Sequence, residues 1–381
     1  MKVRLEKTFE QGPIRPPSEA NSLFLRVNRN CAWNKCLFCP VYKNETFSLR
    51  KREDVLFDID MLSECIRIIK SVQKETSLLW KHLYPLQLKY PEISPIAFSN
   101  AFRWSQNYRK NIFLQDASIF STPFQDLAAI LAYVKEHLHP ENITAYACAK
   151  DVCSFSIKEL MELRDLGLTQ IHMGLESGSN KVLSYMAKGA PRIEMIIAGQ
   201  NLKKAGITLC VYVMPGLGGK ELSDEHATLT ASAIKEITPD VVRLRTLSII
   251  PSTPLWKKME RHEFISLAQI DTVREIRGFL EQIENTNTIL VSDHIANILE
   301  SLAGQLPKEL NKLKEIADIF LAWPVEKQTA FVIGRRAGIV RHLEDINSSK
   351  RKEKITLLMD LWKVTPQTLD AVSIEMMRQY M

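Results

Sequence analysis

Hydrophobic positions along this chain follow two alternating periods. Short apolar runs predict β-strands, and the segments between them carry apolar residues at three- and four-residue spacing, which predicts amphipathic helices. The predicted strands cover 23–27, 111–117, 143–149, 169–177, 208–217 and 241–250, and the predicted helices cover 58–73, 124–138, 156–166 and 221–237. Because strands that alternate with helices form parallel β/α units, we expect an α/β fold, a partial (β/α)6 barrel of the TIM type.

Two parts of the chain depart from this alternation. Residues 78–110 are aromatic, proline-containing and basic, and we interpret them as an insertion between the first helix and the second strand. Beyond Trp256 the apolar spacing becomes helical, over 267–283, 294–306 and 308–323 among others. The expected organisation is an N-terminal arm (1–20), a β/α core (21–256) that contains the insertion, and a helical C-terminal region (257–381).

The composition places the chain among soluble globular proteins of a reducing compartment. A net charge of +6 and a hydrophobic fraction of 45% are ordinary for 381 residues. No apolar run reaches the roughly 18 residues of a membrane span, and the N-terminus lacks the apolar segment of a secretion signal. Seven cysteines are few and clustered, which favours metal binding or chemistry over a disulfide framework. We therefore expect a cytoplasmic protein without a membrane partner.

Three cysteines follow the first predicted strand directly, in the stretch "NCAWNKCLFCP". Cys31, Cys36 and Cys39 have C-x4-C-x2-C spacing, which suits iron–sulfur clusters and also zinc. A structural site is normally closed by four ligands, so three thiolates leave a metal position open for chemistry. The alternative is a plant-type two-iron centre with Cys65 as the fourth ligand, although Cys65 falls on the apolar stripe of a predicted helix.

The runs "IRPPSEANSLFLRVNRNCAWNKCLFC" and "HMGLESGSNKVLSYMAKG", set within six β/α units, resemble the radical S-adenosylmethionine (SAM) superfamily. The resemblance covers roughly residues 15–256. It is closest to the subgroup that contains the methylthiotransferases and the oxygen-independent coproporphyrinogen dehydrogenases. One departure is that the commonest loop in the superfamily is C-x3-C-x2-C, whereas this loop has one more residue between its first two cysteines.

The resemblance implies an oxygen-sensitive enzyme in which Cys31, Cys36 and Cys39 ligate a [4Fe–4S] cluster. In this superfamily the unique iron chelates SAM, and one electron cleaves the sulfonium to give a 5′-deoxyadenosyl radical. The radical abstracts hydrogen from the substrate, here expected to be a small molecule. The electron would come from a donor such as flavodoxin or ferredoxin.

The resemblance also implies a set of residues at the carboxyl ends of the strands that bind SAM. Phe38, just before the last cysteine, would lie near the adenine. Glu176 would accept hydrogen bonds from the ribose hydroxyls, with Ser177 next to it at the end of the strand. Gly174, on the same face of the strand as Glu176, leaves room for a ligand close to the backbone.

The charged ends of SAM would meet a second group of residues. Lys188 or Arg192 would bind the carboxylate, although lysine lacks the bidentate fork of arginine. Gln115 and Asp116 occupy the place where related enzymes often carry a glycine-glycine-glutamate motif for the amino group. Pro215 begins a loop whose backbone would pair with adenine.

Two other functions are kept as alternatives. The first is a radical SAM enzyme that modifies tRNA or another RNA, because the stretch 102–110 interleaves aromatic residues with Arg103, Arg109 and Lys110. A solvated loop explains the same stretch more simply. The second is a non-catalytic iron–sulfur or zinc protein that transfers electrons or binds a partner.

Overall fold

The computed structural model describes residues 8–73, 80–108 and 110–378, and it divides into two compact units. The first unit contains the chain up to Asn34, residues 44–173 and residues 201–208. The second contains residues 35–43, 174–200 and the chain from Leu209 onward. The chain passes from one to the other within the cysteine segment and again after Lys43. It also passes within strand β6 (Leu168–Glu176), within helix α8 (Arg192–Lys204) and after Thr208, the first residue of strand β7.

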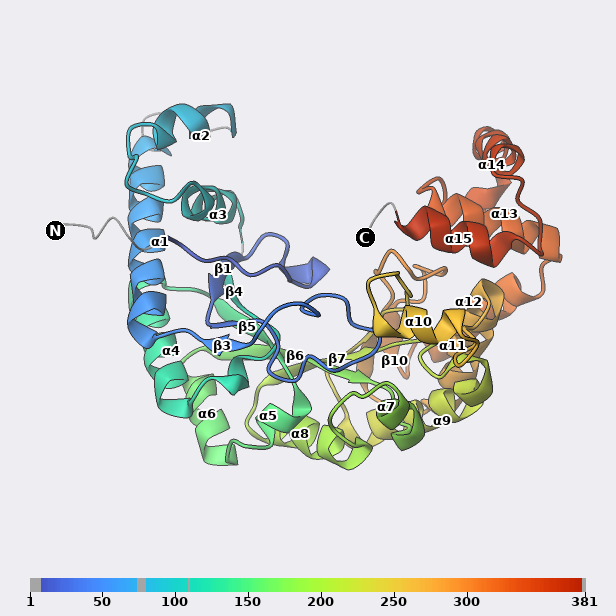
Figure 1. Ribbon diagram of the computed structural model, residues 1–381, viewed down its shortest axis with the longest axis horizontal. Helices are drawn as coiled ribbons and strands as arrows, with labels where there is room; N and C mark the ends of the chain where they lie inside the picture. The colour runs from blue at the N-terminus through green and yellow to red at the C-terminus, as the bar shows by residue number, and fades with distance from the viewer. Residues whose placement is uncertain (1–7, 74–79, 109, 379–381) are drawn as a thin grey trace. The chain divides into compact units, whose positions relative to one another are not determined.

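The first unit is built on parallel strands (Figure 1). Strand β1 (Leu23–Arg26) pairs with β4 (Asn111–Gln115), β4 with β5 (Asn142–Ala147), and β5 with β6, all in parallel. Arg26 and Gln115, the last residues of β1 and β4, lie opposite each other. The cysteine segment therefore leaves β1 beside the carboxyl end of β4.

Helices and a short ribbon complete the first unit. The helix α1 packs against α3 and α4, and the ribbon strands β2 and β3 pair antiparallel. The bounds are β2 (Asn28–Arg29), β3 (Ser48–Leu49), α1 (Arg52–Gln73), α2 (Trp80–Gln87), α3 (Pro95–Ser105), α4 (Phe124–Leu138), α5 (Ala149–Val152), α6 (Ile157–Asp165) and the 3-10 turns η1 (Pro17–Glu19) and η2 (Ile119–Ser121).

The second unit continues the parallel pattern. Strand β7 (Thr208–Val213) pairs with β8 (Val241–Leu244), and β8 pairs with β9 (Thr288–Val291), both in parallel. Strand β10 (Gly304–Leu306) is antiparallel to β9. The strand order is β1-β4-β5-β6-β7-β8-β9-β10, which gives one mainly parallel sheet.

The helices of the second unit form two groups. Helix α11 packs against α9 and α12, and α13 packs against α14 and α15, the red end of the chain in Figure 1. The bounds are α7 (Asn180–Tyr185), α9 (Gly219–Ile237), α10 (Pro254–Glu260), α11 (Gln269–Gln282), α12 (Leu310–Leu321), α13 (Val325–Arg336), η3 (Leu343–Asn347), α14 (Ser349–Leu361) and α15 (Leu369–Arg378). No helix in the described part of the chain is long and apolar enough to cross a membrane.

The α/β class, the parallel sheet and the helical C-terminal region are confirmed. All six predicted strands form, most of them shorter than predicted. The predicted helix over 294–306 is wrong, because that segment is a loop that ends in β10. Strand β9, which precedes the loop, was not predicted. The buried side chains of Ile298, Leu299 and Leu302 give the segment its helix-like spacing. Arg335 and Arg336 donate to the backbone carbonyls of Asn297, Ile295 and Ala296, so these carbonyls are used in hydrogen bonds outside a helix.

The insertion is helical, and its aromatic residues are structural. Helix α3 buries Phe102 and Trp104, so the expectation of a solvated loop is wrong for this part of the stretch. The buried amide of Asn100 donates to the carbonyl of Phe24 (2.8 Å) and accepts from its N–H (3.1 Å). These bonds satisfy the N–H and carbonyl of Phe24, which would otherwise have no hydrogen-bond partner at the edge of the sheet. Arg109 lies outside the described residues.

The turn between β6 and α7 requires glycine at position 178. A Cβ on Gly178 would overlap the backbone carbonyl of Leu229 in α9, which cannot move like a flexible side chain. Gly178→Ala is therefore expected to lower the free energy of unfolding by at least about 2 kcal/mol, through overpacking. Urea denaturation measures this change.

The matched control is Gly278→Ala. Gly278 lies inside α11, and a Cβ there would meet nothing within 4 Å. Since alanine is the better helix former, this variant should gain roughly 1 kcal/mol. Equal stability of the two variants would contradict the close approach of β6–α7 to α9.

Candidate functional site

In the first unit, a buried ion pair fixes the residue that precedes the cysteines. Asp116 follows β4 and has no exposed surface. Its Oδ2 accepts from Arg26 Nη2 (2.6 Å) and from the backbone N–H of Asn30 (3.0 Å). Arg26 Nη2 also donates to Asn30 Oδ1 (3.0 Å), and Asn30 is held at a left-handed φ of 69°. The start of the cysteine segment is therefore set by charges at the ends of β1 and β4.

Gln115 fastens the N-terminal arm. Its Oε1 accepts from Gly12 N (2.9 Å), and its Nε2 donates to the carbonyls of Gly12 (3.0 Å) and Ile14 (2.9 Å). Both amide N–H groups are thereby used. A role for Gln115 and Asp116 at the amino group of SAM stays a prediction; the contacts described are with the chain itself.

The cysteine segment is anchored differently in each unit. In the first unit the backbone N–H of Asn34 approaches Cys31 Sγ (3.3 Å). In the second unit Leu37 N donates to the carbonyl of Met186 (3.0 Å), and Leu255 N donates to the carbonyl of Leu37 (3.0 Å). Cys36 Sγ lies 4.0 Å from the carbonyl of Lys188.

Phe38 packs against an apolar cluster of the second unit, whose buried members are Val182, Met186, Met214, Leu217, Ile249, Leu255 and Phe264. The residue before the last cysteine is thus held by side chains that follow β6, β7 and β8. This packing fixes the backbone between Cys36 and Cys39, and it leaves the Phe38 side chain only partly buried.

The thiols differ in their suitability as ligands. Cys31, Cys36 and Cys39 are all half-buried, which suits groups that must lose a proton and bind a ligand. Cys65 has no exposed surface, and burial raises the pKa of its thiol to about 12, which disfavours Cys65 as the fourth ligand of a two-iron centre. Among the residues that the structure describes, no three or more His, Cys, Asp or Glu side chains are gathered as a metal site. The ligand role of the three cysteines therefore rests on their spacing and exposure.

Glu176 is the most unusual residue of the second unit. It ends β6 with a left-handed φ of 63°, a conformation that costs a side-chain-bearing residue about 1–3 kcal/mol. Its carboxylate is 9% exposed, with Oε1 3.4 Å from Lys188 Nζ and with Oε2 buried and without a hydrogen-bond partner. A buried carboxylate oxygen without a donor is rare, because it forfeits its hydration. A hydroxyl donor from a ligand would complete it.

Gly174 makes room for this pair. A Cβ at position 174 would overlap Glu176 Oε1 and would lie 2.9 Å from Lys188 Nζ. The structure thus brings three of the predicted residues together: Gly174, Glu176 and Lys188. Arg192 is directed elsewhere, since its guanidinium binds Ser232 Oγ (2.9 Å) and Glu236 Oε1 (2.5 Å) on α9.

A buried histidine connects the ends of β6 and β7. His226 Nε2 lies 3.1 Å from the carbonyl of Met214, and Nδ1 lies 2.8 Å from Ser177 Oγ. Because a carbonyl only accepts, Nε2 carries the proton and Nδ1 accepts from the Ser177 hydroxyl. Met214 N donates to the carbonyl of Glu176 (3.0 Å). Ser177 is therefore used in bracing Glu176, a role that the sequence did not indicate.

A buried carboxylate holds the next loop. Glu275 of α11 accepts from Gly216 N (2.6 Å) and from Ser223 Oγ (2.6 Å), and Pro215 accepts from Leu247 N through its carbonyl (2.8 Å). Burial raises the pKa of Glu275 to about 7, against the lowering effect of these two hydrogen bonds. Sequence analysis missed Glu275. The available signal was an acid on the same helical face as Thr272, three residues before it, and Phe279, four residues after it, both of which are buried.

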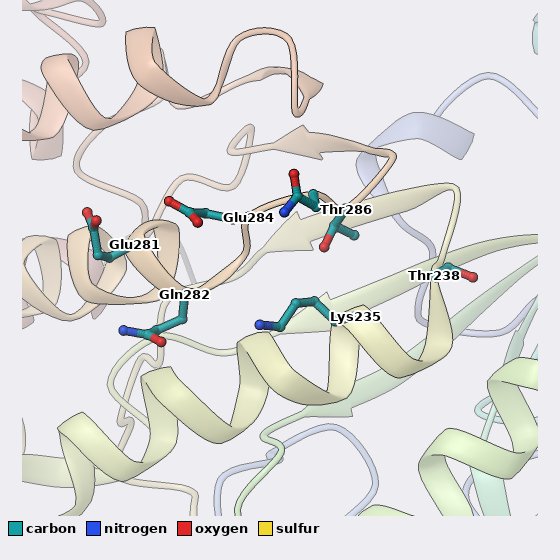
Figure 2. A pocket seen from close by; sticks show the side chains of 7 residues that line it. Lys235, Thr238, Glu281, Gln282, Glu284 and Thr286 are labelled. Atoms are coloured by element: carbon teal, nitrogen blue, oxygen red, sulfur yellow. The ribbon is translucent and has the colours of Figure 1, made fainter.

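The described residues also form cavities away from these strand ends. One of about 380 Å³ is lined by Lys235 and Thr238 at the end of α9 and by Glu281, Glu284 and Thr286 at the end of α11 (Figure 2). These segments lead into β8 and β9, so the cavity lies at the amino ends of the strands. In β/α folds that end contributes stability, whereas chemistry lies at the carboxyl ends.

Comparison with known proteins identifies a family. The profile of the Radical SAM superfamily matches residues 25–230, more than half of the chain. Two curated relatives are tRNA uridine(34) acetyltransferases of Methanocaldococcus infernus (29% identical over 115 residues) and Methanocaldococcus jannaschii (26% over 108 residues). The matches cover 30% and 28% of this chain but only 21% and 20% of those proteins.

Solved structures are matched at low identity and with low TM-scores. The archaeal Elp3 of Methanocaldococcus infernus matches with 17% identity and a TM-score of 0.39, over 49% of this chain and 47% of that one. The cobalamin-dependent radical SAM enzyme OxsB matches with 13% identity and a TM-score of 0.46, over 94% and 54%. The predicted subgroup of methylthiotransferases and coproporphyrinogen dehydrogenases stays a prediction.

The raised pKa of Glu275 predicts a pH dependence of stability. Between about pH 4.5 and 7 the folded protein holds a proton on Glu275 that the unfolded chain has lost, so stability falls as the pH rises through this window, by roughly 3 kcal/mol. Glu275→Gln keeps an acceptor for Gly216 and a donor for Ser223, and it should remove this fall. Urea midpoints at pH 5 and pH 8 measure the effect. The control is Glu353→Gln, at an exposed acid of α14. An equal change of the urea midpoint between pH 5 and pH 8 in all three proteins would contradict the raised pKa of Glu275.

Proposed function

This chain belongs to the radical S-adenosylmethionine superfamily of enzymes, and we propose that it cleaves SAM reductively and abstracts hydrogen from a small-molecule substrate. The observation that carries the proposal is the Glu176 carboxylate, with Oε2 buried and lacking a donor. The ribose of SAM carries hydroxyl donors of the required kind. The cost of the strained backbone and the unpaired oxygen is recovered when such a ligand binds.

Three residues of the second unit have a role in this proposal. Glu176 accepts from the ribose hydroxyls, and Lys188, beside it, supplies a positive charge for the carboxylate of SAM. Phe38, held by its apolar cluster, presents its partly buried ring to the adenine. Arg192 has no role in the proposal, since its guanidinium is directed to Ser232 and Glu236 on α9.

Cys31, Cys36 and Cys39 would hold the [4Fe–4S] cluster that enzymes of this superfamily bind. When bound, the reduced cluster supplies the electron that splits the sulfonium of SAM into methionine and a 5′-deoxyadenosyl radical. The chain's own contribution is to position the ligands and to exclude water from the reacting atoms. An external one-electron donor, such as flavodoxin or ferredoxin, completes the reaction.

A second candidate substrate is RNA. It is favoured by the local similarity to tRNA uridine(34) acetyltransferases, although that similarity spans about a fifth of those proteins. Against it, the aromatic residues of the basic stretch are used in the core. Phe102 and Trp104 are buried, and the guanidinium of Arg103 lies over the Phe24 ring at 4.7 Å. They are therefore not surface platforms for stacked bases.

The cluster assignment predicts different results for two cysteines. After anaerobic reconstitution and reduction with dithionite, the wild-type chain should bind about four irons and release 5′-deoxyadenosine from SAM. Cys36→Ala should abolish the release, because two thiolates do not retain the cluster. Cys65→Ala should still release 5′-deoxyadenosine, since the Cys65 thiol is buried and its pKa is raised. Release that survives Cys36→Ala would overturn the assignment. Release that depends on added tRNA would support the RNA substrate.

The SAM contact at Glu176 predicts a loss of affinity. Glu176→Gln keeps the shape but removes the negative charge, and it should weaken SAM binding roughly tenfold, the worth of one charge-assisted hydrogen bond. Gly174→Ala should do the same by displacing both Glu176 and Lys188. Equilibrium dialysis with labelled SAM measures the affinity. Glu353→Gln and Gly278→Ala are the matched controls, and unchanged affinity in both test variants would refute the contact.

A further inference from the structure

A small cavity lies at the carboxyl ends of β7 and β8 in the second unit, with a volume of about 50 Å³. Gly216 follows β7, Thr246 and Ser248 follow β8, and Arg336 and Ser373 come from α13 and α15. The C-terminal region thus contributes side chains to the end of the sheet at which β/α enzymes carry their chemistry.

The wall of this cavity contains a buried cation without a counter-charge. Arg336 is 3% exposed. Its guanidinium donates to Ser373 Oγ (2.9 Å), Gln269 Oε1 (2.5 Å) and the carbonyls of Ile295 (3.0 Å) and Ala296 (3.0 Å). These acceptors are all neutral, and within the described part of the chain no carboxylate forms an ion pair with Arg336. Four of its five N–H groups are used, which leaves one donor.

Positive charge accumulates around this position. Burial, followed by the charges of Arg245, Arg336 and Arg243, lowers the pKa of His294 to about 4. Asp293 neutralises Arg243 through an ion pair of 2.5 Å. Arg245 is exposed to solvent, so of these charges that of Arg336 stays buried without an opposite charge, and neutral His294 adds none. A buried, uncompensated positive potential favours an anion.

An unsatisfied hydroxyl lies in the same wall. Thr246 is 7% exposed, and its Oγ1 has no hydrogen-bond partner. Its backbone is fixed, since Thr246 N donates to Asn297 Oδ1 (2.9 Å). A buried hydroxyl that makes no hydrogen bond is destabilising, and an oxyanion would accept a hydrogen bond from it.

We propose that this cavity binds one oxyanion group, a carboxylate or a phosphate, of the small-molecule substrate, through the charge of Arg336 and the hydroxyl of Thr246. That the oxyanion belongs to the substrate rests on the proposed function, whereas the oxyanion site itself does not. The volume suits the terminal group of a small molecule, and the burial of Arg336 keeps an RNA backbone out.

The test is binding of inorganic phosphate and of succinate to the full chain, without SAM, measured by titration calorimetry and by the shift of the melting temperature. The wild type should bind at least one of the two and melt at a higher temperature in its presence. Arg336 also supports the fold, so the decisive variant is Thr246→Val. It should melt higher than the wild type when no anion is present, and it should bind the anion roughly tenfold more weakly.

The matched control is Thr288→Val on β9, whose hydroxyl is also buried and without a partner. This variant should gain stability in the same way but keep the wild-type affinity for the anion. The proposal is overturned if neither anion binds, if Thr246→Val binds as tightly as the wild type, or if tRNA displaces the anion. Because release of 5′-deoxyadenosine is measured separately, failure of SAM cleavage with intact anion binding would reject the proposed function and leave the oxyanion site standing.

Discussion

The conformation at the end of β6 is the constraint on which the second unit depends. Glu176 adopts a left-handed backbone there, and the strain is balanced by bonds on both sides of it. Its carbonyl accepts from Met214 N, and the neighbouring Ser177 hydroxyl donates to His226, which donates in turn to the Met214 carbonyl. Because this hydrogen-bonded loop is buried and closed, it holds the Glu176 carboxylate still while one of its oxygens has no partner within the protein. A ligand that donates a hydrogen bond would meet a preorganised acceptor.

The C-terminal region extends this bracing to β8. Arg335 and Arg336, adjacent at the end of α13, donate to the carbonyls of Asn297, Ile295 and Ala296. Asn297 donates to the carbonyl of Leu244 at the end of β8. A helix far along the chain is therefore tied to a strand end through one short loop. The helical region is thereby part of the framework of the strand ends and more than a covering layer.

The sequence predicted the strands well because apolar runs between helices leave little choice of structure. Strand alternation predicted that Gly174 and Glu176 share a face, whereas Lys188 was expected near them through the resemblance to related enzymes. Sequence analysis did not find Glu275, His226 or Arg336, each of which is a polar residue on a helix. Their roles depend on which strand end each helix crosses, and that is decided by tertiary packing. The same limitation explains the wrong helix at 294–306, where burial gave apolar spacing and Arg335 and Arg336 take the backbone carbonyls of Ile295, Ala296 and Asn297 that a helix would use.

The buried charged groups fall into two physical classes. In the first unit the charges are matched, since Arg26 pairs with Asp116 at the ends of β1 and β4, and Arg50, just after β3, pairs with Asp58 on α1. In the second unit, Glu176 has an unpaired oxygen, Thr246 an unpaired hydroxyl, and Arg336 a charge without an opposite. A buried charged group that is not fully paired lowers stability, and it persists where selection acts on binding rather than on folding. The positions of Glu176 at the end of β6 and of Arg336 beside Thr246, which follows β8, therefore point to ligands at these strand ends: a hydroxyl donor at Glu176 and an anion at Arg336.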